Sequence, residues 1–276
     1  MELAARRPVV PLYMDPREEA ERVDEVLWGW PVTVLEEGPG DWLRVETAYR
    51  YRGWARLAHF GPAWQAPADG VVAAPFADLL SAPTVEAPVL DTLPRGALVR
   101  TLPDPGPEGW RKIALPEGRE GYTKSSYLEK YYEIPPILSG AALRRRAVDR
   151  ALRYLGTPYR WGGKSPLGID CSGLTFMAWF FQGVRLYRDA RLAEGFPARA
   201  IAWEERQPGD LLYFPGHIAL YLGAERYIHA TARAGDDGVV INSLDPAAPD
   251  FRGDLLEKLQ GVGSVFPLIA PEEAGG

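Results

Sequence analysis

The sequence contains little cysteine and histidine, and it has no long apolar run. Cys171 is the only cysteine among 276 residues, which excludes an intramolecular disulfide and removes any need for an oxidising compartment. No segment approaches the ~20 apolar residues that span a bilayer, and Met1–Pro8 lacks the apolar core of a signal peptide. We therefore expect a cytoplasmic protein with no membrane span.

The charge balance argues against a nucleic-acid partner. The formal net charge is −6 and the isoelectric point is near 5.3, whereas nucleic-acid surfaces are normally basic. The one basic cluster, Arg144–Arg146, is interpreted as a solvated helix face. The length allows roughly two or three domains.

From residue 8 to about residue 130, short β-type runs alternate with Pro, Gly and Asp, which indicates small all-β units. One pattern occurs twice: Trp42 and Trp110 are each followed 12 residues later by an aromatic residue after glycine, in Gly53-Trp54 and Gly121-Tyr122. Two copies of one small barrel explain this spacing. We expect Trp42, Trp54 and Trp110 to lie in barrel cores, because large aromatic residues dominate small cores.

These glycine-aromatic pairs resemble the closing strands of bacterial SH3-like domains. Two stretches are interpreted as linkers: Trp64–Ala73, which is rich in Pro, Gly and Ala, and Glu133–Pro136, which is rich in Pro. The sequence therefore predicts SH3-like domains over residues 1–66 and 67–135, and a further domain over residues 136–276.

Two helices are predicted in that last domain. Leu143, Ala147, Ala151 and Leu155 recur at helical spacing and stop at Gly156. A second helix follows Cys171 and is apolar on nearly every face, so we expect it to be buried. Cys171 at its N-terminus suggests a nucleophile, since the helix dipole and unpaired N–H groups favour a thiolate and lower the thiol pKa.

Consecutive antiparallel strands are predicted after the second helix, at Leu211–Phe214, His217–Gly223 and Arg226–Ala230. Because side chains alternate along a strand, His217 and His229 could meet on one face of the sheet. A cysteine nucleophile needs a base, and the base needs a third polar group to fix its tautomer. Cys171, His217 and His229 could supply all three.

The motifs in this half resemble the NlpC family of papain-like cysteine peptidases. They are Tyr159-Arg160-Trp161-Gly162-Gly163, Asp170-Cys171-Ser172-Gly173, Pro208-Gly209-Asp210-Leu211, His217-Ile218-Ala219-Leu220-Tyr221-Leu222-Gly223 and Tyr227-Ile228-His229-Ala230. The resemblance implies an α+β papain-like catalytic domain preceded by two small all-β SH3-like barrels. It also implies a cysteine endopeptidase that hydrolyses the γ-D-glutamyl-L-diamino acid bond of murein peptides without a metal or other cofactor. Tyr159 and the Cys171 N–H are the expected oxyanion donors.

SH3-like domains ahead of such a domain resemble enzymes of murein peptide recycling, which act on tripeptides or tetrapeptides with a free N-terminal L-Ala. By position, Asp170 and Ser172 are expected to bind that amine, with Glu25 and Tyr51 of the first barrel as further contributors. Enzymes that this chain resembles commonly carry Arg-Asp-Ser where it has Arg188-Asp189-Ala190. The serine hydroxyl is therefore missing, which puts one expected hydrogen bond to substrate in doubt.

Three alternatives remain open. The chain could be a cell-wall peptide-binding protein with an inactive peptidase domain, or a thiol acyltransferase on the same fold. One cysteine and two histidines also form a possible zinc set.

Overall fold

The computed structural model describes residues 1–104 and 106–268 and consists mostly of β-strands with few helices. The chain divides into two compact units, the first comprising Met1–Tyr131 and the second beginning at Tyr132. No helix in the described part of the chain is both long enough and apolar enough to cross a bilayer.

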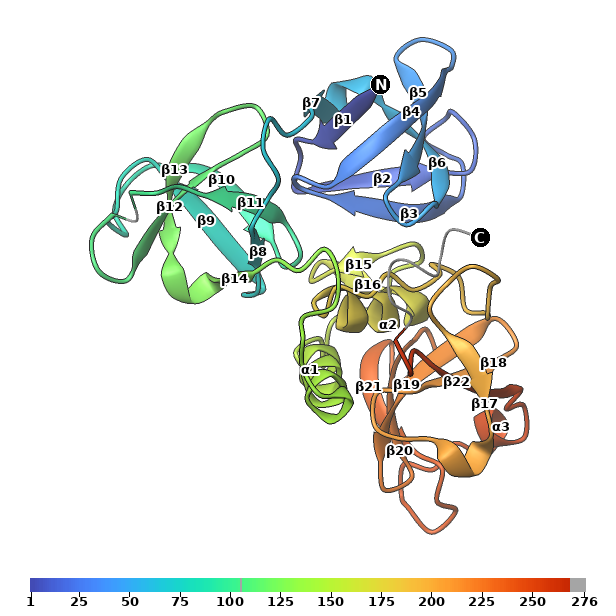
Figure 1. The fold of residues 1–276 in the computed structure, drawn as a ribbon. Helices are drawn as coiled ribbons and strands as arrows, with labels where there is room; N and C mark the ends of the chain where they lie inside the picture. Colours follow the sequence, from blue (N-terminus) through green and yellow to red (C-terminus); the bar gives the residue numbers. More distant parts are fainter. Residues whose placement is uncertain (105, 269–276) are drawn as a thin grey trace. The chain divides into compact units, whose positions relative to one another are not determined.

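The first unit contains two antiparallel seven-stranded sheets (Figure 1). The first sheet comprises β1 (Glu2–Ala5), β2 (Val9–Tyr13), β3 (Arg22–Leu27), β4 (Pro31–Glu37), β5 (Trp42–Thr47), β6 (Arg52–Arg56) and β7 (Phe60–Pro62). The second comprises β8 (Gly70–Val72), β9 (Phe76–Leu80), β10 (Val89–Pro94), β11 (Leu98–Thr101), β12 (Trp110–Ala114), β13 (Glu120–Lys124) and β14 (Leu128–Lys130). Short 3-10 turns, Leu57–His59 and Ser125–Tyr127, precede the last strand of each sheet.

The two sheets share one strand order. The first runs β3-β2-β6-β5-β4-β1-β7 and the second runs β10-β9-β13-β12-β11-β8-β14, so each strand of the first has its counterpart in the second. The predicted internal repeat is therefore confirmed. The predicted linker Trp64–Ala73 is wrong at its C-terminal end, because β8 occupies Gly70–Val72 and is buried.

Glycine occurs at the same position of both repeats for a steric reason. A Cβ on Gly53 would lie 2.8 Å from the Leu12 Cβ, and one on Gly121 would lie 2.8 Å from the Leu80 carbonyl oxygen. Both glycines thus allow two strands to approach closely. The aromatic residue that follows is less buried than expected: Trp54 is only partly buried and packs over the Gly38 backbone, so its assignment to the core is wrong.

Trp42 and Trp110 are buried, at 4% and 9% exposure, as predicted. A third tryptophan joins the two sheets. Trp28 follows β3 of the first sheet, yet it packs in the core of the second sheet with Leu93, Val99 and Ile113. The Leu98 N–H donates to the Trp28 carbonyl at 2.8 Å, so the two sheets share a core.

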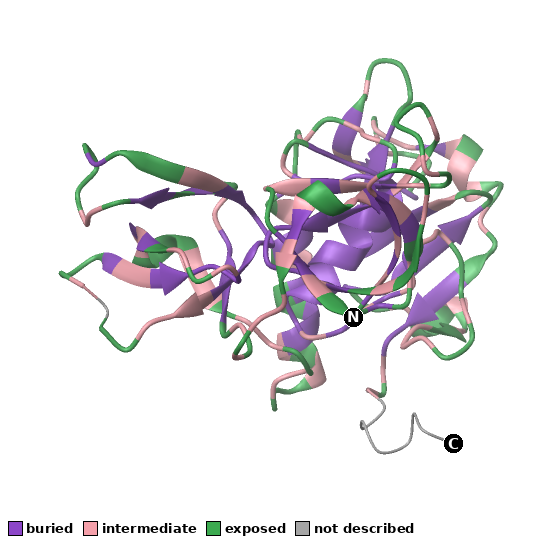
Figure 2. Ribbon diagram, turned by 90° about the horizontal axis from the view of Figure 1, so that it is seen from above, coloured by how far each residue is buried: buried purple, intermediate pink, exposed green. Residues whose placement is uncertain are grey.

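The second unit combines two long helices with a six-stranded antiparallel sheet of order β17-β22-β18-β19-β20-β21. Its elements are α1 (Gly140–Leu152), β15 (Lys164–Ser165), β16 (Gly168–Ile169), α2 (Cys171–Phe180), β17 (Arg199–Ile201), β18 (Leu211–Phe214), β19 (His217–Gly223), β20 (Arg226–Thr231), β21 (Gly238–Ser243), α3 (Gly253–Leu256) and β22 (Gly261–Ser264). Every residue of α2 is buried, and α2 packs against α1, β19 and β20 (Figure 2).

Helix α1 differs from its prediction at two points. It ends at Leu152, so Leu155 lies beyond it and is 48% exposed. Arg144 is not a solvated residue, because it donates to the Asp210 carboxylate at 2.7 Å and both side chains are buried. This ion pair attaches α1 to the turn before β18, which holds the helices against the sheet.

Candidate active site

Cys171 is the first residue of α2, as the sequence predicts. The Asp170 carboxylate caps the helix by accepting from the Gly173 N–H at 2.6 Å. The Asp170 N–H in turn donates to the Gly163 carbonyl at 3.2 Å, just ahead of the β15–β16 hairpin. A Cβ on Gly173 would collide with that same carbonyl. The glycine of the Asp-Cys-Ser-Gly motif therefore allows the start of α2 to lie against the hairpin.

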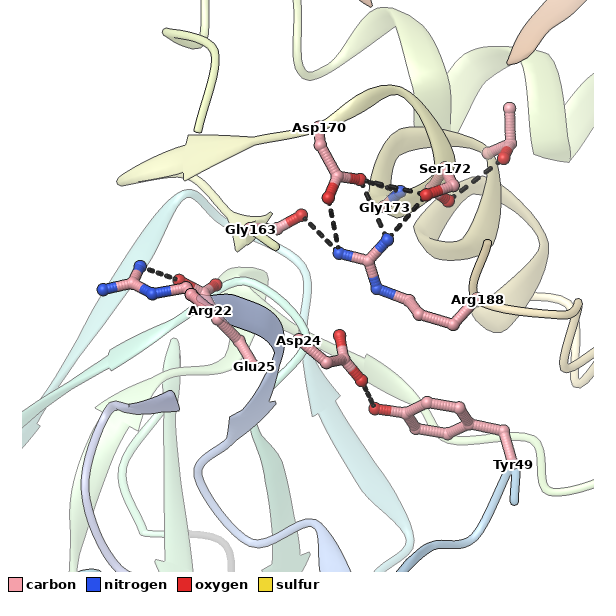
Figure 3. Close-up of polar contacts among 10 residues, drawn as sticks. Arg22, Asp24, Glu25, Tyr49, Gly163, Asp170, Ser172, Gly173 and Arg188 are labelled. Carbon is pink, nitrogen blue, oxygen red and sulfur yellow. Dashed lines mark hydrogen bonds and ion pairs between the residues drawn. The ribbon is translucent and has the colours of Figure 1, made fainter. Parts of the chain in front are cut away.

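A buried arginine holds the residues on both sides of the cysteine (Figure 3). Arg188 donates to both carboxylate oxygens of Asp170, at 2.9 and 2.8 Å, and to the Ser172 hydroxyl at 2.7 Å. A fourth bond reaches the Gly163 carbonyl at 3.2 Å. Arg188 is 2% exposed, so this is a desolvated, bidentate ion pair rather than a surface contact. Asp170 and Ser172, the expected amine-binding residues, are thus brought together and both contact Arg188.

The two histidines lie on neighbouring strands, as predicted. Strands β19 and β20 are antiparallel, with Leu220 opposite Ile228. His217 Nε2 and His229 Nδ1 are hydrogen-bonded at 2.7 Å. His229 is fully buried, whereas His217 at the start of β19 is partly exposed.

A residue that the sequence analysis missed extends this pair. Asn242 Oδ1, on β21, is 2.8 Å from His229 Nε2, and the Asn242 amide donates to the Asp250 carbonyl at 3.0 Å. The only available signal was an amide near the end of the mostly apolar strand Gly238–Ser243. Arg188 was also missed, since nothing in its local sequence connects it with a carboxylate 18 residues earlier.

Cys171 lies near the beginning of β19, since hydrogen bonding by the backbone of Ile218, next to His217, acts to lower the pKa of its thiol. His217 Nε2 is engaged by His229, so Nδ1 is the ring nitrogen that remains for the cysteine.

The thiol pKa departs from expectation. Burial raises the pKa of Cys171 to about 12, and the Asp170 charge adds to the rise; Arg188 and two backbone N–H groups act in the opposite direction. The prediction of a lowered pKa is wrong because desolvation outweighs the helix terminus. Burial also lowers the pKa of His217 to about 3 and that of His229 to about 4. All three groups are thus shifted toward their neutral forms.

Tyr159 is a neighbour of the cysteine. Its backbone bridges to Ile169, just before Asp170. Burial raises the pKa of its phenol well above the ordinary value, and the neighbouring Cys171 and Asp170 contribute to the rise. The phenol therefore keeps its proton and can donate a hydrogen bond at neutral pH.

The remaining expected residues belong to the first unit. Glu25 on β3 is fully buried and accepts from Arg22 at 3.0 Å. Tyr51 is partly buried, and its N–H donates to the Thr47 hydroxyl at 3.0 Å. Beside Glu25, the buried Asp24 accepts from Tyr49 at 2.5 Å (Figure 3). A role for Glu25 and Tyr51 in substrate binding stays a prediction. Within the described residues, no three His, Cys, Asp or Glu side chains converge as a metal-ligand set.

Comparison with known proteins identifies the family. A sequence model described as "NlpC/P60 family" matches residues 156–249. Dipeptidyl-peptidase 6 of Lysinibacillus sphaericus is 42% identical over 267 residues, covering 92% of this chain and 96% of that protein. The chain belongs to the NlpC/P60 family.

Two further comparisons find similarity over part or nearly all of the chain. The bifunctional muramidase/DL-endopeptidase CwlT of Bacillus subtilis is 28% identical over 151 residues, 49% of this chain and 44% of that protein. The crystal structure of an NlpC/P60 family protein from Bacillus cereus superimposes with a TM-score of 0.80, over 97% of this chain and 100% of that one, at 19% identity. The fold is thus shared over nearly the whole length.

Proposed function

We propose that this protein is a cytoplasmic cysteine endopeptidase that cleaves the γ-D-glutamyl-L-diamino acid bond of murein tripeptides or tetrapeptides with a free N-terminal L-Ala. The observation that carries the proposal is the position of Cys171, at the start of α2 and against the strand that begins with His217. His217 supplies the base, and the hydrogen bonds from His217 to His229 and from His229 to Asn242 hold it in place.

The neutral resting state sets the mechanism. His217 takes the thiol proton as the sulfur attacks the amide carbonyl, so charge separates only during the reaction. The Cys171 N–H and the Tyr159 hydroxyl then donate to the oxyanion, and loss of one such donor costs about 10²–10³ in rate. The imidazolium of His217 gives its proton to the departing amine, which leaves a thioester on Cys171. Water hydrolyses the thioester with His217 again acting as base.

Recognition of a free amine follows from the polar groups beside the cysteine. Asp170 Oδ1 accepts three hydrogen bonds, from the Gly173 N–H, from Arg188 and, at 3.2 Å, from the Ser172 hydroxyl, whereas Oδ2 accepts one from Arg188. We therefore assign Oδ2 and the Ser172 hydroxyl to the amine. Because Arg188 offsets the carboxylate charge, further acceptors are needed, and Glu25 and Tyr51 are the proposed ones. Cleavage after L-Ala-γ-D-Glu releases a dipeptide, which fits the name of the Lysinibacillus dipeptidyl-peptidase.

We also propose that the two sheets of the first unit are SH3-like domains and that the second sheet is a scaffold. The repeated strand order supports the first statement. The packing of Trp28 in the core of the second sheet supports the scaffold role. Trp28 directly follows β3, the strand that carries Glu25, so the second sheet holds the end of that strand in place.

The test is release of free diamino acid from L-Ala-γ-D-Glu-meso-diaminopimelate. We expect release by the wild type, none by Cys171→Ala, and at least a tenfold slower release when the L-Ala amine is acetylated. No release by the wild type, or equal release by Cys171→Ala, would sink the peptidase proposal. Release that requires an added acceptor amine would instead identify an acyltransferase.

A further inference from the structure

Asn242 lies outside the predicted set of Cys171, His217 and His229, and its hydrogen bonds fix the orientation of its side chain. Asn242 is 7% exposed and has one partner on each side, the Asp250 carbonyl and His229 Nε2. A backbone carbonyl only accepts, so the amide NH₂ must face Asp250. The amide oxygen therefore faces His229.

This orientation determines where the protons of both histidines lie. An amide oxygen only accepts, so His229 Nε2 carries a hydrogen. A neutral imidazole has one N–H, and His229 Nδ1 must therefore accept. At 2.7 Å, its donor is His217 Nε2. The remaining nitrogen, His217 Nδ1, then has a free lone pair, which is the form that a general base toward Cys171 requires.

These proton positions require both rings to be neutral, and the surroundings of the two rings favour the neutral form. Burial and the charge of Arg252 lower the pKa of both histidines, and the charge of His229 lowers the pKa of His217 further. The hydrogen bond to Asn242 and the charges of Asp236 and Asp254 raise the pKa of His229, yet that pKa stays near 4. Both imidazoles are therefore neutral at pH 7.

We propose that Asn242 is a positioning residue that selects the basic tautomer of His217 by acting through His229. The inference rests on the proposed function, since it assigns His217 as the base. Without the amide oxygen, His229 can carry its hydrogen on Nδ1 instead. His217 Nε2 must then accept, its Nδ1 becomes protonated, and the ring cannot take the thiol proton.

Nitrogen-15 NMR of the histidine rings reads the tautomers directly. The chain has three histidines, and His59→Gln assigns the signal that belongs to neither strand. At pH 7 we expect the Nε2–H tautomer for both His217 and His229. In Asn242→Ala we expect mixed tautomers and a KM within about twofold of wild type. We expect kcat to fall about 10–10²-fold, by analogy with loss of the hydrogen-bond partner that orients a metal-binding histidine. An Nδ1–H tautomer of His217 in the wild type, or unchanged tautomers in Asn242→Ala, would overturn the inference.

Two further variants separate this role from a structural one. Ser243 is the next residue of β21. Ser243→Ala removes two part-buried hydrogen bonds, one donated to the Glu225 carbonyl and one accepted from the Asp245 N–H, and neither involves a histidine. We expect wild-type tautomers and kcat. Asn242→Asp keeps an acceptor for His229 but raises its pKa. We expect activity near wild type at high pH and loss on acidification, as His229 gains a second proton and forces His217 Nδ1 to be protonated. Activity as low as in Asn242→Ala at every pH would contradict this.

The tautomer measurement does not depend on turnover. If the wild type releases no diamino acid but both rings are Nε2–H, the peptidase proposal fails and the assignment of the tautomers stands. If the wild type is active and His217 carries its hydrogen on Nδ1, the inference about Asn242 fails alone.

Discussion

Replacement of Arg188 by methionine tests whether the ion pair beside the nucleophile holds the site together. Methionine keeps most of the side-chain volume and removes the charge and all of the donors. Asp170 is 6% exposed and Arg188 is 2% exposed, so the variant leaves a carboxylate buried beside Cys171 without its bidentate partner. Ser172 and the Gly163 carbonyl each lose a donor as well.

Breaking a buried pair by removing one partner costs about 3–5 kcal/mol. For a unit of this size, each kcal/mol shifts the melting temperature by about 2–4 °C. We therefore expect Arg188→Met to lower the melting temperature of the second unit by roughly 10 °C in calorimetry. Arg191→Met is the matched control, because Arg191 is exposed and contacts only the Tyr187 ring and hydroxyl in the described contacts. It should change stability by less than about 0.5 kcal/mol.

A second substitution isolates the pair. Asp170→Asn retains an oxygen that can cap α2 and carries no charge. The double variant Arg188→Met/Asp170→Asn should therefore recover at least half of the loss, giving a coupling free energy of about 1–3 kcal/mol. A loss below about 1 kcal/mol in Arg188→Met, or no coupling, would refute the reasoning.

Two predictions concern the rest of the molecule. Trp28→Ala should destabilise the first unit by about 3–5 kcal/mol in urea unfolding, and both sheets should unfold in one transition. Trp54→Ala, at a partly exposed ring, should destabilise the unit clearly less. Separate transitions for the two sheets would contradict the shared core. Because burial raises the thiol pKa of Cys171 to about 12, its alkylation rate should rise about tenfold per pH unit from pH 6 to 9; a plateau in that range would show a preformed thiolate–imidazolium pair.

The sequence predicted those parts of the site that depend on local periodicity. Alternation along a strand places His217 and His229 on one face, and the register of β19 and β20 then brings their rings together. The start of α2 was equally predictable, because Asp170 is a strong helix cap and the following residues are apolar on all sides.

The features that the sequence did not predict depend on partners distant along the chain. Arg144 looked like a solvated residue because its partner Asp210 lies 66 positions away. Arg188 stands in the Arg188-Asp189-Ala190 motif, but nothing in that motif points to its ion pair with Asp170. Asn242 belongs to a segment whose local pattern shows only packing. The thiol pKa was predicted in the wrong direction for the same reason: a helix terminus is visible in sequence, whereas the desolvation that outweighs it comes from the surrounding elements.

Stoichiometric titration of the single cysteine tests the central claim most directly. Aliquots of the wild type are treated with increasing amounts of a thiol-alkylating reagent, and the modified fraction is measured by intact mass together with the rate of diamino acid release. Because Cys171 is the only cysteine, one adduct identifies the site. We predict that activity falls linearly with the modified fraction and reaches zero at one adduct per chain. Activity that persists in fully alkylated protein would contradict the assignment of Cys171 as the nucleophile.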